Sequence, residues 1–457
     1  MHLLARDLHG LDDAGAAVDL EQTPGKIVFL SFSDSELSLL ARVHDEEAAS
    51  RPSLRCASLA QLKHPFSVDL YLDKVARHAR LVVVRLLGGK EYWSYGVEQL
   101  AALSRAQGFA LAIVPGDGMD DPRLRDASTL APLDCVRIWS FFQDGGAENM
   151  RALLGFAASL VGTPAPWRES ARIESAGYCL AARRTAGADA RRALLVFYRS
   201  LFLSDDHAPI VALADALAAL GVAVEAAFVA SLKDGASDAF LREAIGAFKP
   251  DVIVNTTAFS ARGADGCVLD LADAPVLQAA LSTSSREAWA ASKRGANGAD
   301  LAMNIVLPEV DGRIFTRAIS FKAPAGALLA SQFAQTRHAP DPSRIGFVAQ
   351  LAANWAGLRH KTNREKSLAL ILSDYPARRG RGGYAIGLDT QASVEAIVEA
   401  LTAADYDVGG SEPPRDLMRA LEDGRHHARL PLDEYRRLSE RLPREFANAV
   451  RNAWGEP

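Results

Sequence analysis

The sequence predicts an α/β protein made of several Rossmann- or flavodoxin-like parallel-sheet domains, with helices on both faces and a helical C-terminal tail. Three observations predict this class. Short apolar runs rich in β-branched residues, such as KIVFLSF (26–32) and ARLVVVRLLG (79–88), end in Gly, Ser, Asp or Pro, as buried parallel strands do. Amphipathic segments with helical spacing alternate with these runs. The length of 457 residues allows about three domains.

The first predicted domain covers residues 1–165. A third strand is expected at FALAIVPG (109–116), and the segment before it, YGVEQLAALSRAQG (95–108), has a helical face closed by a glycine. A further helix is expected over 147–162. Its apolar positions follow the spacing i, i+3, i+4, i+7, i+8 and i+11: Met150, Leu153, Leu154, Ala157, Ala158 and Val161. The TPAPW segment after it cannot continue a helix and marks the domain boundary.

The second predicted domain covers residues 166–345 and repeats the strand–helix–strand pattern. Helices are expected at 208–221 and ending near Lys249, with strands between them. The expected strands are RRALLVFYRS (191–200), VAVEAAFVASL (222–232), DVIVNTTAF (251–259) and APVLQAAL (274–281). Short joints between these elements predict a parallel sheet. Its polar loops then gather at the carboxyl edge, where open α/β sheets bind ligands.

The third predicted domain covers residues 346–457. It begins with an apolar strand, LALIL (368–372), followed by a helix that Asp389 or Thr390 can cap. The charged tail, 431–457, is expected to be helical and to break at Pro443.

Composition excludes several classes of protein. The net charge of −5 argues against binding to nucleic acid or to an anionic membrane, and no apolar run approaches the roughly 20 residues of a membrane span. The N-terminus, MHLLARDLHGLDD, is too short and too acidic for a signal peptide. The four cysteines lie far apart without metal-binding spacing. A reduced, cytoplasmic protein is expected.

Several nucleotide and catalytic motifs are missing from the sequence. It contains no GxxxxGK[ST], no GxGxxG after a strand, no HExxH and no GxSxG. We therefore expect that this chain does not bind nucleoside triphosphates through a P-loop.

An arginine- and glycine-rich loop follows the predicted strand of the third domain, in SDYPARRGRGG. Arg378, Arg379 and Arg381 lie in it, and a second basic cluster, which includes Arg359 and Lys361, lies just upstream. Two interpretations stand. The loop is a solvated turn, or it is a clamp on ligand carboxylates, which arginine binds in a bidentate manner.

Polar residues at two expected strand ends of the second domain are further candidates. In the SDDH loop, Asp205, Asp206 and His207 can bind a divalent metal or move protons, or Asp206 can simply cap the helix that follows. Asn255 and the two threonines after it can donate hydrogen bonds to a ligand or close a turn.

The segment LPEVDGRI (307–314) is a third candidate. Glu309, Asp311 and Arg313 alternate there as on a half-exposed strand or hairpin, with Asp-Gly as the turn signal. Acid/base chemistry and a salt-bridged hairpin both fit this pattern.

Motifs spread along the whole chain resemble one family. The matching segments are MHLLA with VDL–Q-TPG, RLLGGKEYWSYGVEQL, FYRS–DDHAPI, VNTTAFS, SREAW (285–289), DLAMNIVLPEVDGRI and RHKTNREKSLALILSDYPARRGRGGYAIGLDTQAS (359–393). Together they resemble the large subunit of aerobic cobaltochelatase (the CobN type), which is related to the magnesium chelatase H subunit.

The resemblance implies a ligase-type, ATP-dependent chelation in cobalamin (vitamin B12) biosynthesis, inserting Co²⁺ into hydrogenobyrinic acid a,c-diamide. In that family the large subunit binds the tetrapyrrole and the metal, while AAA+ partners of the CobS and CobT type use ATP and Mg²⁺. The resemblance carries possible roles to matching loop residues, with the catalytic residues unknown. Substrate binding is implied for Arg199, Asn255, Arg359, Lys361, Asn363, Arg378, Arg379 and Arg381, and metal binding for Asp205, Asp206 and His207.

The family's chain continues far beyond 457 residues, so the sequence matches only its N-terminal part. We expect a truncated chain, with much of the insertion chemistry outside it and no chelation by this portion alone. The alternative is a non-catalytic docking or scaffold region of a magnesium or cobalt chelatase large subunit.

Overall fold

The computed structural model describes residues 17–116, 119–263, 266–372, 383, 387–409 and 429–456. Its contacts divide the chain into two units, Met1–Arg359 and His360–Pro457. The first unit contains two sheets, which we call sheet A and sheet B.

Sheet A is a four-stranded parallel sheet with the order β2-β1-β3-β4. Its strands are β1 (Ile27–Ser31), β2 (Leu54–Ser58), β3 (Leu81–Leu86) and β4 (Ala110–Pro115). This is the order in which flavodoxin-like sheets begin. The parallel arrangement fits the sequence pattern, because the strands are almost fully buried, largely apolar runs that need cover on both faces.

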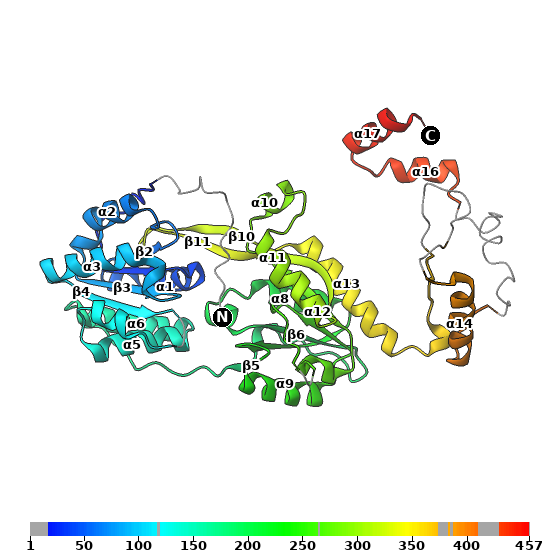
Figure 1. Ribbon diagram of the computed structural model, residues 1–457, viewed down its shortest axis with the longest axis horizontal. Helices are drawn as coiled ribbons and strands as arrows, with labels where there is room; N and C mark the ends of the chain where they lie inside the picture. The colour runs from blue at the N-terminus through cyan, green and yellow to red at the C-terminus, as the bar shows by residue number, and fades with distance from the viewer. Residues whose placement is uncertain are drawn as a thin grey trace. The chain divides into compact units, whose positions relative to one another are not determined.

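Helices cover both faces of sheet A (Figure 1). They are α1 (Asp34–Glu46), α2 (Pro65–Lys74), α3 (Ser94–Gln107), α4 (Pro122–Ala127), α5 (Pro132–Asp144) and α6 (Ala147–Leu160). Side chains alternate along the strands, so Phe29 packs in the core with α1, α5 and α6. Val28 and Leu30 point the other way, into the core with α2 and α3.

Sheet B has seven strands in the order β11-β10-β9-β8-β6-β7-β5. They are β5 (Ala176–Tyr178), β6 (Arg192–Tyr198), β7 (Ala223–Val229), β8 (Val252–Asn255), β9 (Val276–Leu281), β10 (Ile314–Leu328) and β11 (Phe333–Pro340). The five central strands are parallel and have the flavodoxin order 2-1-3-4-5, with antiparallel strands β5 and β11 at the two edges.

Helices also cover both faces of sheet B. Its core on one face includes α8 and α13, and its core on the other includes α9. The helices around this sheet are α7 (Arg199–Leu203), α8 (Ala208–Ala219), α9 (Gly235–Phe248), α10 (Arg286–Ala291), α11 (Gly298–Asp300), α12 (Leu307–Val310) and α13 (Pro342–Arg359). The predicted α/β class with helices on both faces is confirmed.

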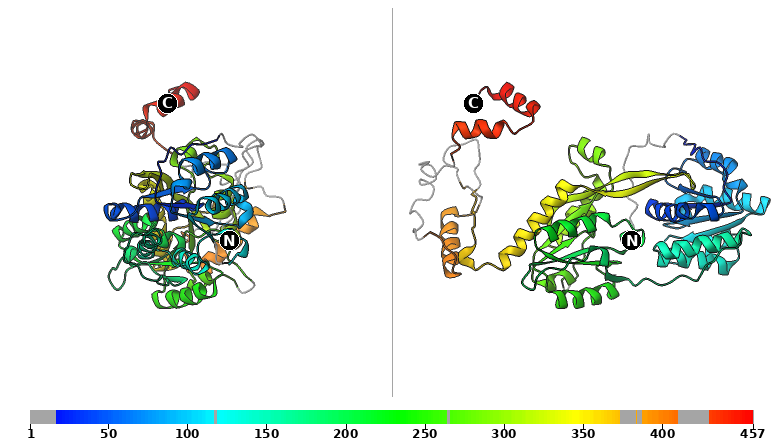
Figure 2. Two further views of the ribbon diagram at one scale, coloured as in Figure 1. Left: turned by 90° about the vertical axis from the view of Figure 1, so that its left-hand side faces the viewer. Right: turned by 180° about the vertical axis from the view of Figure 1, so that it is seen from behind.

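The β10–β11 hairpin reaches from sheet B to the helices and strands of sheet A (Figures 1 and 2). Phe333, at its tip, is 7% exposed and belongs to the sheet A core. The Arg55 guanidinium donates to the Ala330 carbonyl at 3.1 Å, and the Gln22 amide donates to the Gln332 carbonyl at 2.8 Å. The hairpin therefore ties the two sheets into one unit.

The second unit is less regular in its described part. It contains α14 (Thr390–Ala403), α16 (Leu432–Ser439) and α17 (Arg444–Trp454). Asp389 caps α14, and Pro443 separates the two tail helices, as the sequence predicts. The strand predicted at 368–372 is wrong, because no described segment pairs with its backbone and Ile371 is 88% exposed.

Two other local predictions differ from the structure. The expected polar loop LFLSDDH contains most of the short helix α7. The expected strand or hairpin at LPEVDGRI begins as helix α12 and turns at Gly312, whose φ is +80°. The domain division expected at 345/346, a position that lies within α13, stays a prediction.

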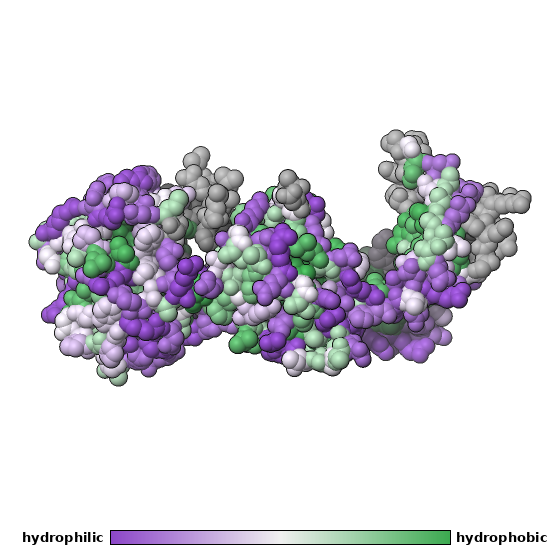
Figure 3. All heavy atoms as spheres, turned by 90° about the horizontal axis from the view of Figure 1, so that it is seen from below, coloured by the Kyte–Doolittle hydropathy of each residue, from purple (hydrophilic) through white to green (hydrophobic). Residues whose placement is uncertain are grey.

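The surface seen from below is largely hydrophilic, with hydrophobic residues in separate small groups (Figure 3). No helix among the described residues combines the length and apolar composition that crossing a lipid bilayer requires.

Candidate functional site

The candidate site lies at the carboxyl edge of sheet B, where β6 and β8 end side by side. In a sheet of order 2-1-3-4-5 these neighbouring strands lead to opposite faces, which creates the crevice where such sheets bind ligands. Tyr198 ends β6 and Asn255 ends β8, and the Tyr198 hydroxyl donates to the Ala258 carbonyl at 3.0 Å. The loop that follows Asn255 therefore closes over this edge.

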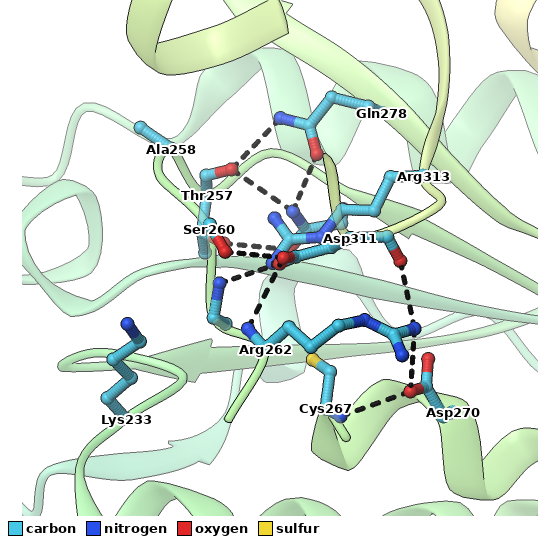
Figure 4. Close-up of polar contacts among 12 residues, drawn as sticks. Lys233, Thr257, Ala258, Ser260, Arg262, Cys267, Asp270, Gln278, Asp311 and Arg313 are labelled. Carbon is cyan, nitrogen blue, oxygen red and sulfur yellow. Dashed lines mark hydrogen bonds and ion pairs between the residues drawn. The ribbon is translucent and has the colours of Figure 1, made fainter. Parts of the chain in front are cut away.

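A buried amide network fixes the start of that loop (Figure 4). The Asn255 amide donates to Gln278 Oε1 at 2.8 Å and to the Thr257 carbonyl at 3.1 Å, while the Thr257 hydroxyl donates to Asn255 Oδ1 at 3.0 Å. The Gln278 amide donates to the same Thr257 carbonyl at 2.9 Å. All three side chains are buried, so in this conformation Asn255 closes a turn.

Asp311 is the acceptor that holds the rest of the loop (Figure 4). Its carboxylate accepts hydrogen bonds from the Ser260 hydroxyl, from the Ala261 N–H at 2.6 Å and from the Arg262 N–H at 3.3 Å. It also forms an ion pair with Arg313 Nη2 at 2.8 Å. Burial alone would raise the pKa of Asp311, but these hydrogen bonds and the charge of Arg313 lower it below 3.8. Asp311 is therefore held as a carboxylate.

Arg313 is among the most buried charges of the described residues, with a side chain 2% exposed. Its Nη2 binds Asp311, whereas its Nε and Nη1 have no hydrogen-bond partner. This is a buried ion pair, not the half-exposed hairpin predicted from the alternating charges. The prediction failed because the preceding residues are helical, which turns both side chains into the protein.

The SDDH loop follows β6 and α7, and it lies against the base of the β10–β11 hairpin. Asp206 is 2% exposed, and its carboxylate accepts from Lys322 Nζ at 3.0 Å and from the His338 N–H at 2.9 Å. Burial and the Lys322 charge lower the pKa of His338 to about 4, so this imidazole is neutral at pH 7. Asp206 thus links the loop to both strands of the hairpin.

Asp205 makes its contacts with arginines from two directions. Its backbone has a φ of +52°, and its carboxylate forms an ion pair with Arg42 Nη2 on α1 at 2.8 Å. Arg337 on β11 donates to the Asp205 carbonyl, and with Arg42 and Asp206 it lines a shallow hollow. His207 stacks on Phe197 at a centroid distance of 6.4 Å. Within the described part of the chain, no group of three or more His, Cys, Asp or Glu side chains is placed to hold a metal ion.

Arg199 is half-buried, and its guanidinium group contacts two backbone segments that are distant from it in the sequence. It donates to the carbonyls of Ile173 at 2.6 Å and Glu174 at 2.9 Å, and more weakly to those of Gln143 and Asp144 at 3.4 Å each. Burial lowers its pKa. Arg199 therefore joins the end of α5 to the segment that leads into sheet B.

The remaining predicted binding residues lie elsewhere. Arg359 donates to the carbonyl of Asp273, which precedes β9 and so lies at the amino edge of the sheet, away from Asn255. In the second unit, Lys361 is exposed and the Asn363 amide donates to the Ala404 carbonyl at 2.8 Å. The predicted arginine loop, with Arg378, Arg379 and Arg381, lies outside the described residues.

Sequence reasoning missed one cluster of cations at this sheet. Arg286, Arg317 and Arg344 converge on aromatic rings beside β10. The only available signal was the SREAW motif, which places an arginine and a tryptophan one helical turn apart; the other two arginines come from separate elements.

A family model described as CobN/Magnesium Chelatase matches residues 139–457. The chain belongs to the CobN/magnesium chelatase family. It is 38% identical to the aerobic cobaltochelatase subunit CobN of Sinorhizobium sp., over 100% of this chain and 38% of that protein. It is 36% identical to the subunit of the same name from Pseudomonas aeruginosa, again over 100% of this chain and 38% of that protein.

A solved structure supports the same assignment. The catalytic subunit of cobaltochelatase from Mycobacterium tuberculosis superposes with a TM-score of 0.68 at 29% identity, covering 94% of this chain and 36% of that one. The chain thus spans 38% of the length of the two curated CobN relatives that it matches. The magnesium chelatase relatives match a smaller share, 47% of this chain for the protein of Rhodobacter capsulatus.

Proposed function

We propose that this chain is part of the tetrapyrrole- and metal-binding subunit of an ATP-dependent cobaltochelatase. The substrate would be hydrogenobyrinic acid a,c-diamide and the inserted metal Co²⁺. One observation carries the proposal: the match to a protein named aerobic cobaltochelatase subunit CobN runs over 100% of this chain at 38% identity.

Insertion of a metal into a tetrapyrrole sets the chemical requirements. The pyrrole N–H protons must leave as the metal ion loses its water ligands. A protein promotes this by holding the ring in a distorted geometry, by placing a base near the N–H groups and by guiding the cation with oxygen or nitrogen ligands. For this chain we propose the holding role, since its paired aspartates and neutral His338 are already engaged in the fold.

ATP would be used by other subunits. The sequence has no P-loop motif, so we propose that AAA+ partners of the CobS and CobT type hydrolyse Mg²⁺-ATP and drive the conformational cycle.

A second candidate function has specific support. Arg199, Asp206 and Asn255 all match the family's motifs, yet each is engaged with neighbouring groups of the same chain. Residues of this kind maintain a fold, which is what a docking or scaffold region of the large subunit requires.

One titration separates the two functions. The purified chain, without ATP, is titrated with hydrogenobyrinic acid a,c-diamide while the tetrapyrrole absorbance is followed. The binding function predicts saturation with a Kd in the tens of micromolar or tighter, equivalent to about −6 kcal/mol. No saturable binding would favour the docking function, and ATP hydrolysis by the chain alone would contradict the proposed division of labour.

A further inference from the structure

Three guanidinium groups lie over three aromatic rings of β10 and the neighbouring helices. The Arg286 guanidinium lies 5.1 Å from the Phe321 ring centroid, and that of Arg344 lies 5.7 Å from the same ring and 5.6 Å from Trp289. Nearby, the Arg317 guanidinium lies 3.6 Å above the ring of Phe347. We call these six residues the arginine–aromatic patch. Stacking on a ring face leaves the N–H edges of a guanidinium directed outward.

The positive charge of the patch is not balanced. Among the described residues, the carboxylate that pairs with it is that of Asp341, which lies 3.2 Å from Arg286 Nε. The Arg317 side chain forms no hydrogen bond or ion pair with any described residue, and its ring partner, Phe347, is 43% exposed. Burial, and next the charge of Arg317, lower the pKa of Arg344, so these like charges lie within electrostatic range of one another.

The backbone adds to the same positive potential. Arg344 lies in the first turn of α13, and its backbone N–H donates to Asp341 Oδ1 at 3.1 Å. The N-terminal end of a helix carries partial positive charge and disfavours basic residues. The Asp341 carboxylate offsets the positive helix end, so the clustering of like charges around Arg344 is what works against stability and points to a role in binding an anion.

The patch lies where a ligand of this sheet would reach it. α10 begins directly after the loop that ends β9 and contacts β10 (Figure 1). The exposed Lys293 and Arg294 follow α10, in a turn whose Gly295 packs against Trp289. A broad ligand could thus meet cations on both sides of the indole.

We propose that the arginine–aromatic patch binds the peripheral carboxylates of a broad, flat polycarboxylate, which, if the proposed function holds, is the tetrapyrrole substrate. Arg317 and Arg286 supply the N–H edges that receive carboxylates, and Arg344 supplies charge behind them. The sequence motifs assign no role to these residues.

The test compares Arg286→Ala, Arg317→Ala and the double variant with wild type in the same absorbance titration at low salt. Each single substitution is expected to raise the Kd about fivefold, which is the loss of affinity expected when one exposed ion pair is removed. Arg242→Ala, which removes an exposed arginine on α9, is the matched control and is expected to leave the Kd unchanged. All four variants are expected to melt within about 2 °C of wild type, because exposed pairs contribute little to stability.

A fully amidated form of the macrocycle completes the design. Wild type is expected to bind it about as weakly as the double variant binds the acid, and the double variant is expected not to discriminate between the two forms. Binding by wild type that none of the patch variants weakens relative to Arg242→Ala would overturn the patch and leave the proposed function standing. Absence of any binding by wild type would overturn both.

Discussion

Replacing Asp311 with alanine should be among the most destabilising single substitutions at the sheet edge. The change leaves the Arg313 side chain, 2% exposed, without its ion-pair partner, and it removes the acceptor of the Ala261 and Arg262 N–H groups. Removing one partner of a buried pair costs about 3–5 kcal/mol. The two N–H groups belong to residues that are half-buried (Ala261) and exposed (Arg262), so water can replace the acceptor that they lose, and this loss adds little. We therefore expect a loss of about 4 kcal/mol in the free energy of unfolding.

Urea unfolding of the full chain, followed by circular dichroism, measures this loss. Arg262→Ala is the control, because its side chain is 48% exposed and its ion pair with Asp270 should contribute less than about 1 kcal/mol. The double variant Asp311→Ala/Arg313→Met also removes the buried, unpaired guanidinium group and should recover a large part of the lost free energy of unfolding. A single variant within about 1 kcal/mol of wild type, or a double variant no more stable than the single, would refute the reasoning.

The pH dependence gives a second measurement at Asp311. Its pKa is lowered in the folded state, so its ionised form contributes stability above the ordinary value of 3.8. That contribution is lost as pH falls from the unfolded value through the lower folded one. Asp311→Ala should therefore lose less stability than wild type on acidification below pH 4.

Three other predictions concern the neighbouring elements. The pKa of His338 is lowered to about 4, so the unfolded chain takes up this proton more readily and the residue costs stability as pH falls from 6.5 toward 4. His338→Gln should recover about 3 kcal/mol of that loss at pH 4. Equal losses of stability with pH in wild type and variant would show that burial of His338 is not the cause. Asp206→Ala should lower the free energy of unfolding by about 3 kcal/mol. Asp205→Ala should lower it by less than about 1 kcal/mol, because the Asp205 side chain is 45% exposed. Equal losses for the two variants in denaturant titrations would contradict the different environments of these side chains. Phe333→Ala should cost about 3 kcal/mol by opening a cavity in the sheet A core, whereas Leu329→Ala, 85% exposed, should be neutral by calorimetry.

Much of the fold is predictable because it depends on local patterns. β4 is an unbroken apolar run, β3 is apolar except for Arg85, and α6 has the full helical spacing, so each can be identified without knowing its neighbours. The LALIL run shows the limit of that reasoning. An apolar strand needs a partner to satisfy its backbone hydrogen bonds, and the sequence does not say whether a partner is present.

The candidate site was harder to predict because its chemistry depends on distant pairs. Asp206 was recognised as a possible metal ligand, but the groups that occupy its carboxylate, Lys322 and the His338 N–H, lie more than a hundred residues away. The metal role of the SDDH loop stays a prediction. Likewise, Arg317 and Arg344 lie close together only because α13 packs against β10, and no short sequence motif predicts this packing.

Hydrogen exchange with and without hydrogenobyrinic acid a,c-diamide tests the central claim most directly, namely that paired charges hold the fold while unpaired ones receive the ligand. Exchange is measured by mass spectrometry on the full chain in the absence of ATP. We expect the macrocycle to slow exchange in residues 282–295 and 342–347 and to leave residues 256–262 unchanged. Unchanged exchange in all these segments, or slowing confined to residues 256–262, would contradict the claim.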